Sequence, residues 1–258
     1  MSVIEPAQAR LRERGPRPRT DRSTHDLVIT AMKRAYAWGG NGQDLIDIPC
    51  GAGALSMRLR ELGFTVTCCD IDPGNFEAAG FRHLQADLDQ SLPLGDRSFD
   101  VVVSVAGIQR ISSPEMAIAE FHRILKPGGI LYLAVPNCGD LRTRFRFLLY
   151  GSLGPLFDSP CFQQTTKSPE ADFRSPLMVP RVECMVREAG FEVLAVHARS
   201  RDLFPYIFLP FSLAACAASW LRSTLDPRRF GNYRRSTTMG MLGAKVYLIV
   251  ARKPAPAG

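Results

Sequence analysis

Short apolar segments alternate with helix-like periods along most of this chain. The apolar segments are rich in β-branched residues, as strands are, and they lie at 44–49, 64–69, 82–86, 99–105, 130–135, 191–197 and 245–252. Between them, apolar residues recur at helical spacing over 23–38, 54–62, 114–125 and 179–189. Glycine, asparagine or proline separates many of these segments, so the connections are short.

This alternation indicates the fold class. The run Phe99–Val105 is almost continuously apolar, which is typical of a strand that is buried on both faces of a parallel sheet. Strands that alternate with helices through short connections predict a doubly wound, Rossmann-like α/β sheet with helices on both faces.

Three segments do not follow the pattern. Residues 1–22 combine prolines and arginines with few large apolar residues, so we expect a disordered basic tail before a single domain at 23–258. Within that domain we expect insertions at about 137–176 and 201–243. Long irregular insertions in compact domains are usually functional, often as a lid or a substrate-binding segment.

The second insertion contains Leu203–Leu221, a stretch without a charged residue. Its length would suffice for a transmembrane helix. The later strand at 245–252 must join the same sheet as the earlier strands, and Pro205 and Pro210 interrupt the helix, so a simple span is disfavoured. Two alternatives remain: a helical insertion over the site or the domain surface, and a peripheral membrane contact through 203–235.

Charge and cysteine usage narrow the class of protein. The formal net charge is +7, and much of it comes from arginines within 10–22 and 222–235. Such segments attract anionic surfaces in general, and no nucleic-acid-binding module accompanies them, so nucleic acid is not the expected partner. The seven cysteines form no C-x-x-C pattern, which indicates reduced thiols and no metal site. We expect a cytoplasmic protein, or one that is peripheral at the inner membrane surface.

The most informative local motif is Asp47-Ile48-Pro49-Cys50-Gly51-Ala52-Gly53. It follows the first strand and precedes the first helix after it. A glycine-containing turn between strand and helix presents backbone N–H groups to a ligand, but the same pattern occurs in many turns.

Five such motifs in order resemble the class I S-adenosylmethionine-dependent methyltransferases of the small-molecule type, which includes the ubiquinone-biosynthesis methyltransferases. The motifs are Leu45–Gly53, Cys69–Asp72, Ala86–Leu88, Ser98–Val102 and Ile124–Gly129. The resemblance covers about 45–136 closely, and 177–200 with 245–252 more loosely. It implies a mostly parallel seven-stranded sheet whose last strand is antiparallel.

The resemblance also implies roles for individual residues. Asp47 would face the positively charged methionine end of S-adenosylmethionine, and Asp70 would accept hydrogen bonds from both ribose hydroxyls. Asp87, with the backbone of Leu88, would contact the adenine edge. The remaining implied cofactor contacts are Pro49, Cys50, Gly51, Gly53, Ile71 and Val105.

The sequence departs from the family pattern in two places. Pro49 replaces the first glycine of the loop, which fixes φ and removes an N–H donor. After the fourth strand, many relatives carry a Glu-His pair where this chain has Gly107-Ile108-Gln109-Arg110. The sequence therefore names no catalytic residue. The candidates for acceptor contacts are Gln109, Arg110, Asn137 and Arg174.

Three functions follow as hypotheses. The first is methyl transfer from S-adenosylmethionine to a small, hydrophobic or lipid-linked acceptor. The second is a non-catalytic cofactor-binding or scaffold protein, which the two departures would favour. The third is a nucleotide-dependent oxidoreductase, because 51–56 approaches G-x-G-x-x-G, but that motif ends in Ser56.

Overall fold

A computed structural model describes Pro16 and residues 20–35, 40–153, 175–198, 204–230 and 237–255. Most of the expected tail at 1–22 and much of the first insertion therefore lie outside the described residues. The strands are β1 Asp44–Asp47, β2 Thr65–Asp70, β3 Arg82–Gln85, β4 Phe99–Val105, β5 Leu125–Pro136, β6 Glu192–Ala198 and β7 Val246–Arg252. The helices along them are α2 Arg22–Ala35, α3 Ala54–Glu61, α4 Pro114–Ile124 and α7 Val179–Glu188, with 3₁₀ turns η1 Pro73–Asn75 and η2 Ile108–Arg110.

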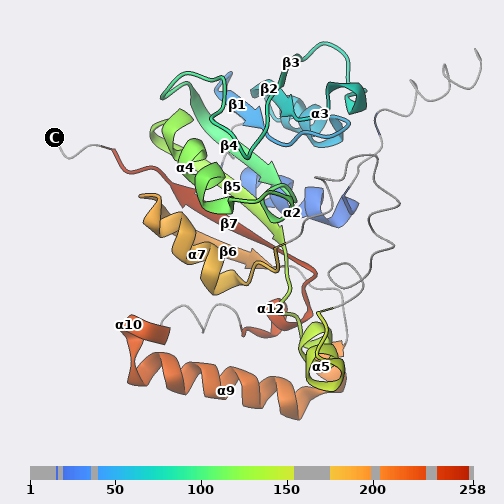
Figure 1. Cartoon of the computed structure of the whole chain (residues 1–258), viewed down its shortest axis with the longest axis vertical. Helices are drawn as coiled ribbons and strands as arrows, with labels where there is room; N and C mark the ends of the chain where they lie inside the picture. The colour runs from blue at the N-terminus through green and yellow to red at the C-terminus, as the bar shows by residue number, and fades with distance from the viewer. Residues whose placement is uncertain are drawn as a thin grey trace, which may run out of the picture.

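All seven strands form one sheet in the order β3-β2-β1-β4-β5-β7-β6 (Figure 1). Strands β1 to β5 pair in parallel, whereas β7 runs antiparallel to both β5 and β6. The predicted doubly wound sheet and its antiparallel last strand are therefore confirmed. The carboxyl ends of β1 to β4 meet at one edge of the sheet, where ligands bind in open α/β sheets.

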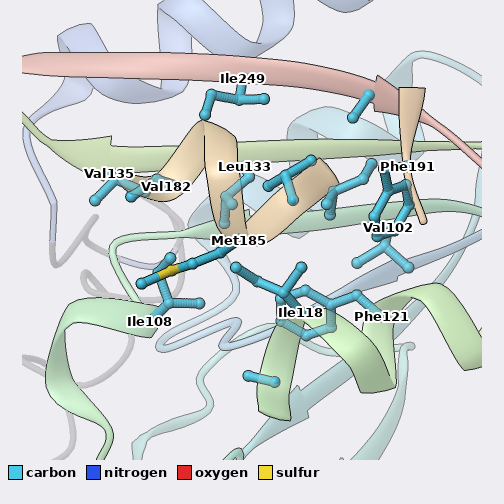
Figure 2. Packing of buried hydrophobic residues seen from close by; sticks show 14 of the residues in the cluster. Val102, Ile108, Ile118, Phe121, Leu133, Val135, Val182, Met185, Phe191 and Ile249 are labelled. Carbon is cyan, nitrogen blue, oxygen red and sulfur yellow. The ribbon is translucent and has the colours of Figure 1, made fainter. Parts of the chain in front are cut away.

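A hydrophobic core lies on each face of the sheet. On one face, α4 and α7 contribute Ile118, Phe121, Val182 and Met185, which Figure 2 shows together with strand residues such as Leu133. On the other face, α2 and α3 contribute residues such as Val28, Met32, Leu55 and Leu59. Because strands such as β4 are buried from both sides, their sequences read as continuous apolar runs.

The segment Lys126–Gly129 differs from the prediction. Because the predicted helix ends at 125 and the predicted strand begins at 130, residues 126–129 would form a turn between them, but helix α4 ends at Ile124 and β5 includes them. The register between β4 and β5 shifts here, from Phe99 opposite Leu125 to Val101 opposite Ile130. Gly128 has a φ of +81°, which only glycine adopts without strain, so the four residues form an irregularity inside the strand.

The insertions are helical where they are described. The first contains α5 Leu141–Tyr150, so the basic, aromatic piece at 142–147 is a helix, contrary to the irregular structure we expected. The second contains α8 Phe204–Ile207, α9 Leu209–Leu225, α10 Pro227–Phe230 and α12 Met239–Gly243. Figure 1 shows α9 along the end of the molecule farthest from β3. Among the described residues, no helix is both long enough and apolar enough to cross a bilayer.

Candidate functional site

The glycine turn predicted after the first strand wraps around the start of α3. Gly51 and Gly53 have φ values of +53° and +85°, and Gly53 is the residue that precedes the helix. A Cβ on Gly53 would lie 2.6 Å from the Ala78 Cβ and 2.8 Å from the Phe76 ring. Any side chain at position 53 would therefore both strain the backbone and clash with the segment after β2.

Asp70 holds the turn against the end of β2. The Gly51 N–H donates to Asp70 Oδ2 at 2.8 Å, and the Asp72 N–H donates to Oδ1 at 3.2 Å. A carboxylate offers about four acceptor positions, so each oxygen can accept one more hydrogen bond. This arrangement suits a pair of adjacent hydroxyl groups. The neighbouring Ile71 side chain is half exposed and could cover one face of such a ligand.

Asp47 lies one strand away and is buried. Its Oδ2 accepts a hydrogen bond from the Ser56 hydroxyl at 2.6 Å, which joins β1 to the first turn of α3. Burial raises the pKa of Asp47 to about 7, the Ser56 hydrogen bond opposes that rise, and the charge of Asp70 adds to it. Protonated and ionised forms of this carboxyl group therefore coexist near neutral pH, and a nearby cation would favour the charged form.

In the sequence, Ser56 stands out only as a departure from G-x-G-x-x-G. Its hydroxyl instead supports the acid at the end of β1. The sequence signal for this role is a hydrogen-bonding residue in the first turn of the helix, two residues after the start of α3.

The third predicted acid, Asp87, follows β3. Its Oδ1 accepts from the Asp89 N–H at 2.9 Å, which forms a tight local turn. Leu88 is buried in the core beside η2, so its side chain anchors the segment and leaves only its backbone for ligand contact. Asp89 in turn accepts from the Ser112 and Ser113 N–H groups at 2.8 and 3.1 Å, which fixes this segment to the loop after β4.

The two sequence departures lie against each other. The Pro49 ring packs onto Gly107, where an added Cβ would stand 2.4 Å from the Pro49 Cδ. The Ile48–Pro49 peptide is cis. Cys50 is buried beside Cys68, and this contact together with burial raises its pKa well above the usual range, so it is a neutral thiol. Val105, at the end of β4, is also buried.

The four candidates for acceptor contacts fall in different environments. The buried Gln109 donates through Nε2 to the Ala106 carbonyl at 2.7 Å, while its Oε1 is buried without a hydrogen-bond partner. Arg110 is exposed at the end of η2. Asn137 donates to the Met241 and Ala244 carbonyls at 2.8 Å each, so its amide ties β5 to α12. Arg174 lies outside the described residues.

The acids at the strand ends do not gather into a metal site. Within the described ranges, no group of three or more His, Cys, Asp or Glu side chains could hold a metal ion. The site consists of the glycine turn, the Asp70 carboxylate with its spare acceptor positions, and the buried Asp47.

A family model described as "Methyltransferase domain" matches residues 46–133. The chain is 34% identical to a malonyl-[acyl-carrier protein] O-methyltransferase of Serratia marcescens over 39% of this chain and 41% of the relative. It is 34% identical to a ubiquinone biosynthesis O-methyltransferase of Caulobacter vibrioides over 37% and 42%, respectively. A ubiquinone/menaquinone biosynthesis C-methyltransferase of Bradyrhizobium diazoefficiens is 29% identical over 64% of this chain and 72% of the relative.

The matches to the Serratia and Caulobacter proteins each span about two fifths of the relative's length. Solved structures share the fold over more of the chain. A S-adenosylmethionine-dependent methyltransferase of Archaeoglobus fulgidus has a TM-score of 0.57 at 14% identity, covering 89% of this chain and 94% of that one. The [4+2]-cyclase SpnF has a TM-score of 0.55 at 18% identity, covering 88% and 81%. The family resemblance predicted from the five motifs is thereby confirmed for residues 46–133, and the fold for the described chain.

Proposed function

We propose, from the premise that residues 46–133 are a class I, S-adenosylmethionine-dependent methyltransferase domain, that this chain methylates a small, hydrophobic or lipid-linked acceptor. The observation that carries the proposal is the Asp70 carboxylate, which braces the glycine turn through Gly51 and keeps one acceptor position on each oxygen. S-adenosylmethionine brings an activated methyl group on a positively charged sulfur.

The residues of the turn fit this cofactor. The ribose hydroxyls would use the spare acceptor positions of Asp70, and the backbone of Gly51 and Gly53 would allow close approach. The half-exposed Ile71 side chain and the turn at Asp87 and Leu88 would border the adenine. Asp47 would attract the cationic methionine end, and its ionised form would be favoured there.

The hydrophobic nature of the acceptor rests on two supports. The relatives named above act in ubiquinone and menaquinone biosynthesis or on malonyl-[acyl-carrier protein], according to their names. In this chain, the insertions that follow β5 and β6 carry exposed apolar side chains such as Phe147 and Ile207. Both insertions leave the sheet at the carboxyl edge, which is the edge that carries the glycine turn.

Positioning, more than proton removal, would be the contribution of the described residues to the reaction. The loop 107–110 contains Gln109, whose Oε1 is buried without a hydrogen-bond partner. The amide would have to turn toward the site to orient an acceptor, and it cannot take a proton at neutral pH. A direct displacement can be accelerated strongly by holding the two reactants in line. An acceptor that is already ionised, such as a carboxylate or an acidic phenol, suits this site best.

Isothermal titration calorimetry with S-adenosylmethionine and S-adenosylhomocysteine tests the cofactor part of the proposal. We expect both to bind the folded chain, and no binding of either would overturn the proposal. Methyl transfer is then tested with a radiolabelled methyl donor and a lipid extract, followed by mass spectrometry of the product.

A non-catalytic cofactor-binding protein is the second candidate, favoured by the Pro49–Gly107 contact at the place where many relatives carry a Glu-His pair. The fold alone does not fix the chemistry, as a neighbour named a [4+2]-cyclase illustrates. Cofactor binding without methyl transfer to any component of the extract would favour this candidate.

A further inference from the structure

Helix α9 presents its apolar side chains outward and its small polar ones inward. The buried or half-buried positions follow helical spacing and are Ser212, Ala215, Cys216, Ser219 and Ser223. The opposite face, also at helical spacing, consists of Ala214, Ala217, Ala218, Leu221 and Leu225, which are all exposed. A surface helix of a water-soluble domain normally has the reverse arrangement, so the outer face of α9 is built for an apolar environment.

The inner face of α9 is nevertheless hydrogen-bonded to neighbouring parts of the protein. The Ser212 hydroxyl donates to the Pro205 carbonyl at 2.7 Å, and the Cys216 thiol donates to the Thr237 carbonyl. These bonds fix the rotation of α9 about its axis. The outward direction of its leucines is therefore set by the fold.

The apolar surface extends beyond α9. Phe145 of α5 packs against Phe208 and Phe211, with ring centroids 5.1 and 5.6 Å apart, and so joins α5 to the start of α9 (Figure 1). We define the α5–α9 surface by its exposed large apolar residues: Phe147, Leu148, Leu149, Tyr150, Tyr206, Ile207, Leu209, Phe211, Leu213, Trp220, Leu221 and Leu225. Exposed large apolar side chains that gather on neighbouring helices in this way mark an interaction site.

The charged residues in the segments that form this surface are mostly basic. Residues 203–243 contain five arginines and a single acid, Asp226, and α5 contains three arginines and no acid. Arg142, Arg222 and Arg228 are exposed in the described part of these segments. Tyrosine and tryptophan are present as well, and both are enriched where a protein meets the boundary between headgroups and acyl chains.

We propose that the α5–α9 surface docks on an anionic lipid bilayer, with α9 lying in the plane of the membrane. The outer leucines, Phe211 and Trp220 would enter the acyl boundary, while the arginines would contact anionic headgroups. Docking of this kind would give a lipid-linked acceptor a direct route to the carboxyl edge of the sheet, and in this way it deepens the proposed function. Only the purpose of the docking rests on the proposed function. A second copy of the chain is a poorer occupant, because a symmetric pair would bring the arginines of both copies together.

Vesicle binding by the full chain tests the proposal. Trp220 is one of two tryptophans, so a Trp38→Phe background reports its surroundings through fluorescence. We expect a blue shift of the emission, and co-sedimentation of the protein, with vesicles of phosphatidylglycerol and phosphatidylcholine in equal parts. Phosphatidylcholine alone should bind at least about ten-fold more weakly, because several arginines lose their partners.

The variant Leu221→Asp probes the surface itself. Leu221 is half exposed, so the fold should tolerate the change while the partition coefficient falls at least about ten-fold. Met116→Asp is the matched control, since Met116 is equally exposed but lies on α4, outside the α5–α9 surface. This substitution should leave vesicle binding unchanged.

Each contrary result has a separate meaning. A folded chain that binds no vesicles, or that binds them equally well as Leu221→Asp, overturns the docking proposal. A dimer detected by light scattering and abolished by Leu221→Asp, without vesicle binding, assigns the surface to a second copy and also overturns it. Calorimetry with S-adenosylhomocysteine on the same samples reports the proposed function independently, since the substituted residues belong to α9 and α4 and not to the glycine turn.

Discussion

Gly107 lies against the ring of Pro49, so that an added Cβ at position 107 would stand 2.4 Å from the Pro49 Cδ. Pro49 is one place where the chain departs from the family pattern, Gly107 begins the segment that forms the other, and the fold brings the two residues into contact. The proline in the turn and the glycine after β4 therefore fit as a pair. A side chain at position 107 therefore requires a change at Pro49.

We expect Gly107→Ala to lower the free energy of unfolding by about 1–3 kcal/mol, because the Pro49 ring cannot move away from the new methyl group without disturbing the turn. Urea denaturation followed by circular dichroism measures this. Pro49→Ala in the same chain should recover about half of the loss or more, since the clashing ring atoms are gone. Gly74→Ala, whose Cβ would meet only the exposed Asp72 side chain at 3.2 Å, is the control. Additive effects of the first two substitutions would contradict the pairing.

Asp70→Asn should weaken cofactor binding at least about ten-fold. An amide has one oxygen in place of two, so its NH₂ group would face either the Gly51 or the Asp72 N–H donor. The same mismatch should lower the free energy of unfolding by about 1–3 kcal/mol. Calorimetry on the folded variant separates the two effects.

Asp72→Asn is the matched control, because that carboxylate accepts hydrogen bonds from Gly74 and Asn75 in an exposed turn. Equal losses of affinity in both variants would remove the special role of Asp70.

Asp47 should make the protein less stable as the pH rises. Its pKa is about 7 in the folded chain and near 4 when unfolded, so between these values the folded state binds more protons. The free energy of unfolding therefore falls as the pH increases from 4 through 7, by up to about 4 kcal/mol for the three units of difference. Asp47→Asn removes this loss, so its stability relative to the unmodified chain should be greater at pH 8 than at pH 5.

The variant Ser56→Ala tests the same titration of Asp47 by removing its hydrogen-bond donor. The Ser56 hydrogen bond stabilises the ionised carboxylate, and without it the pKa of Asp47 should rise further. The decline of stability should then continue to a higher pH than in the unmodified chain. Parallel stability profiles for all three proteins between pH 5 and 8 would show that Asp47 is not the group that titrates.

Lys126 should affect stability modestly and cofactor affinity not at all. Its ammonium group contacts Asp100 Oδ2 at 2.8 Å and Asp44 Oδ2 at 3.3 Å, at the starts of β4 and β1. These contacts lie at the edge of the sheet opposite the glycine turn. Because Lys126 and Asp44 are substantially exposed, Lys126→Ala should cost no more than about 1 kcal/mol. A change in the dissociation constant for S-adenosylhomocysteine larger than about two-fold would argue that the motif acts on the site.

The positions of the strands along the chain and of the acids that end them were predictable because both are local properties. Asp47 and Asp70 each end a short apolar run, and in a parallel sheet such ends meet at one edge. The hydrogen bond from Ser56 to Asp47 and the contact of Pro49 with Gly107 were not predictable in the same way. They join residues whose separation in the sequence carries no pattern, and only the packed turn brings them together.

Helix α5 was missed for a different reason. Arg142, Arg144 and Arg146 alternate with other residues and obscure a helical period, so the segment read as irregular. Its ends nevertheless carry ordinary helix signals. The Asp140 carboxylate accepts from the Thr143 N–H, and Gly151 adopts a φ of +64° after the last turn. Attention to these two residues would have found the helix.

The position of β7 between β5 and β6 has a consequence for the synthesis of the protein. Residues 246–252 leave the ribosome after every other strand, yet β6 joins the sheet only through them. While the chain is being made, β6 and the adjoining edge of β5 must wait with unpaired backbone groups, although strands β1 to β5 can already assemble. A premature stop before residue 246 would therefore release a chain with an open sheet edge, prone to aggregation and a natural target for chaperones and proteases.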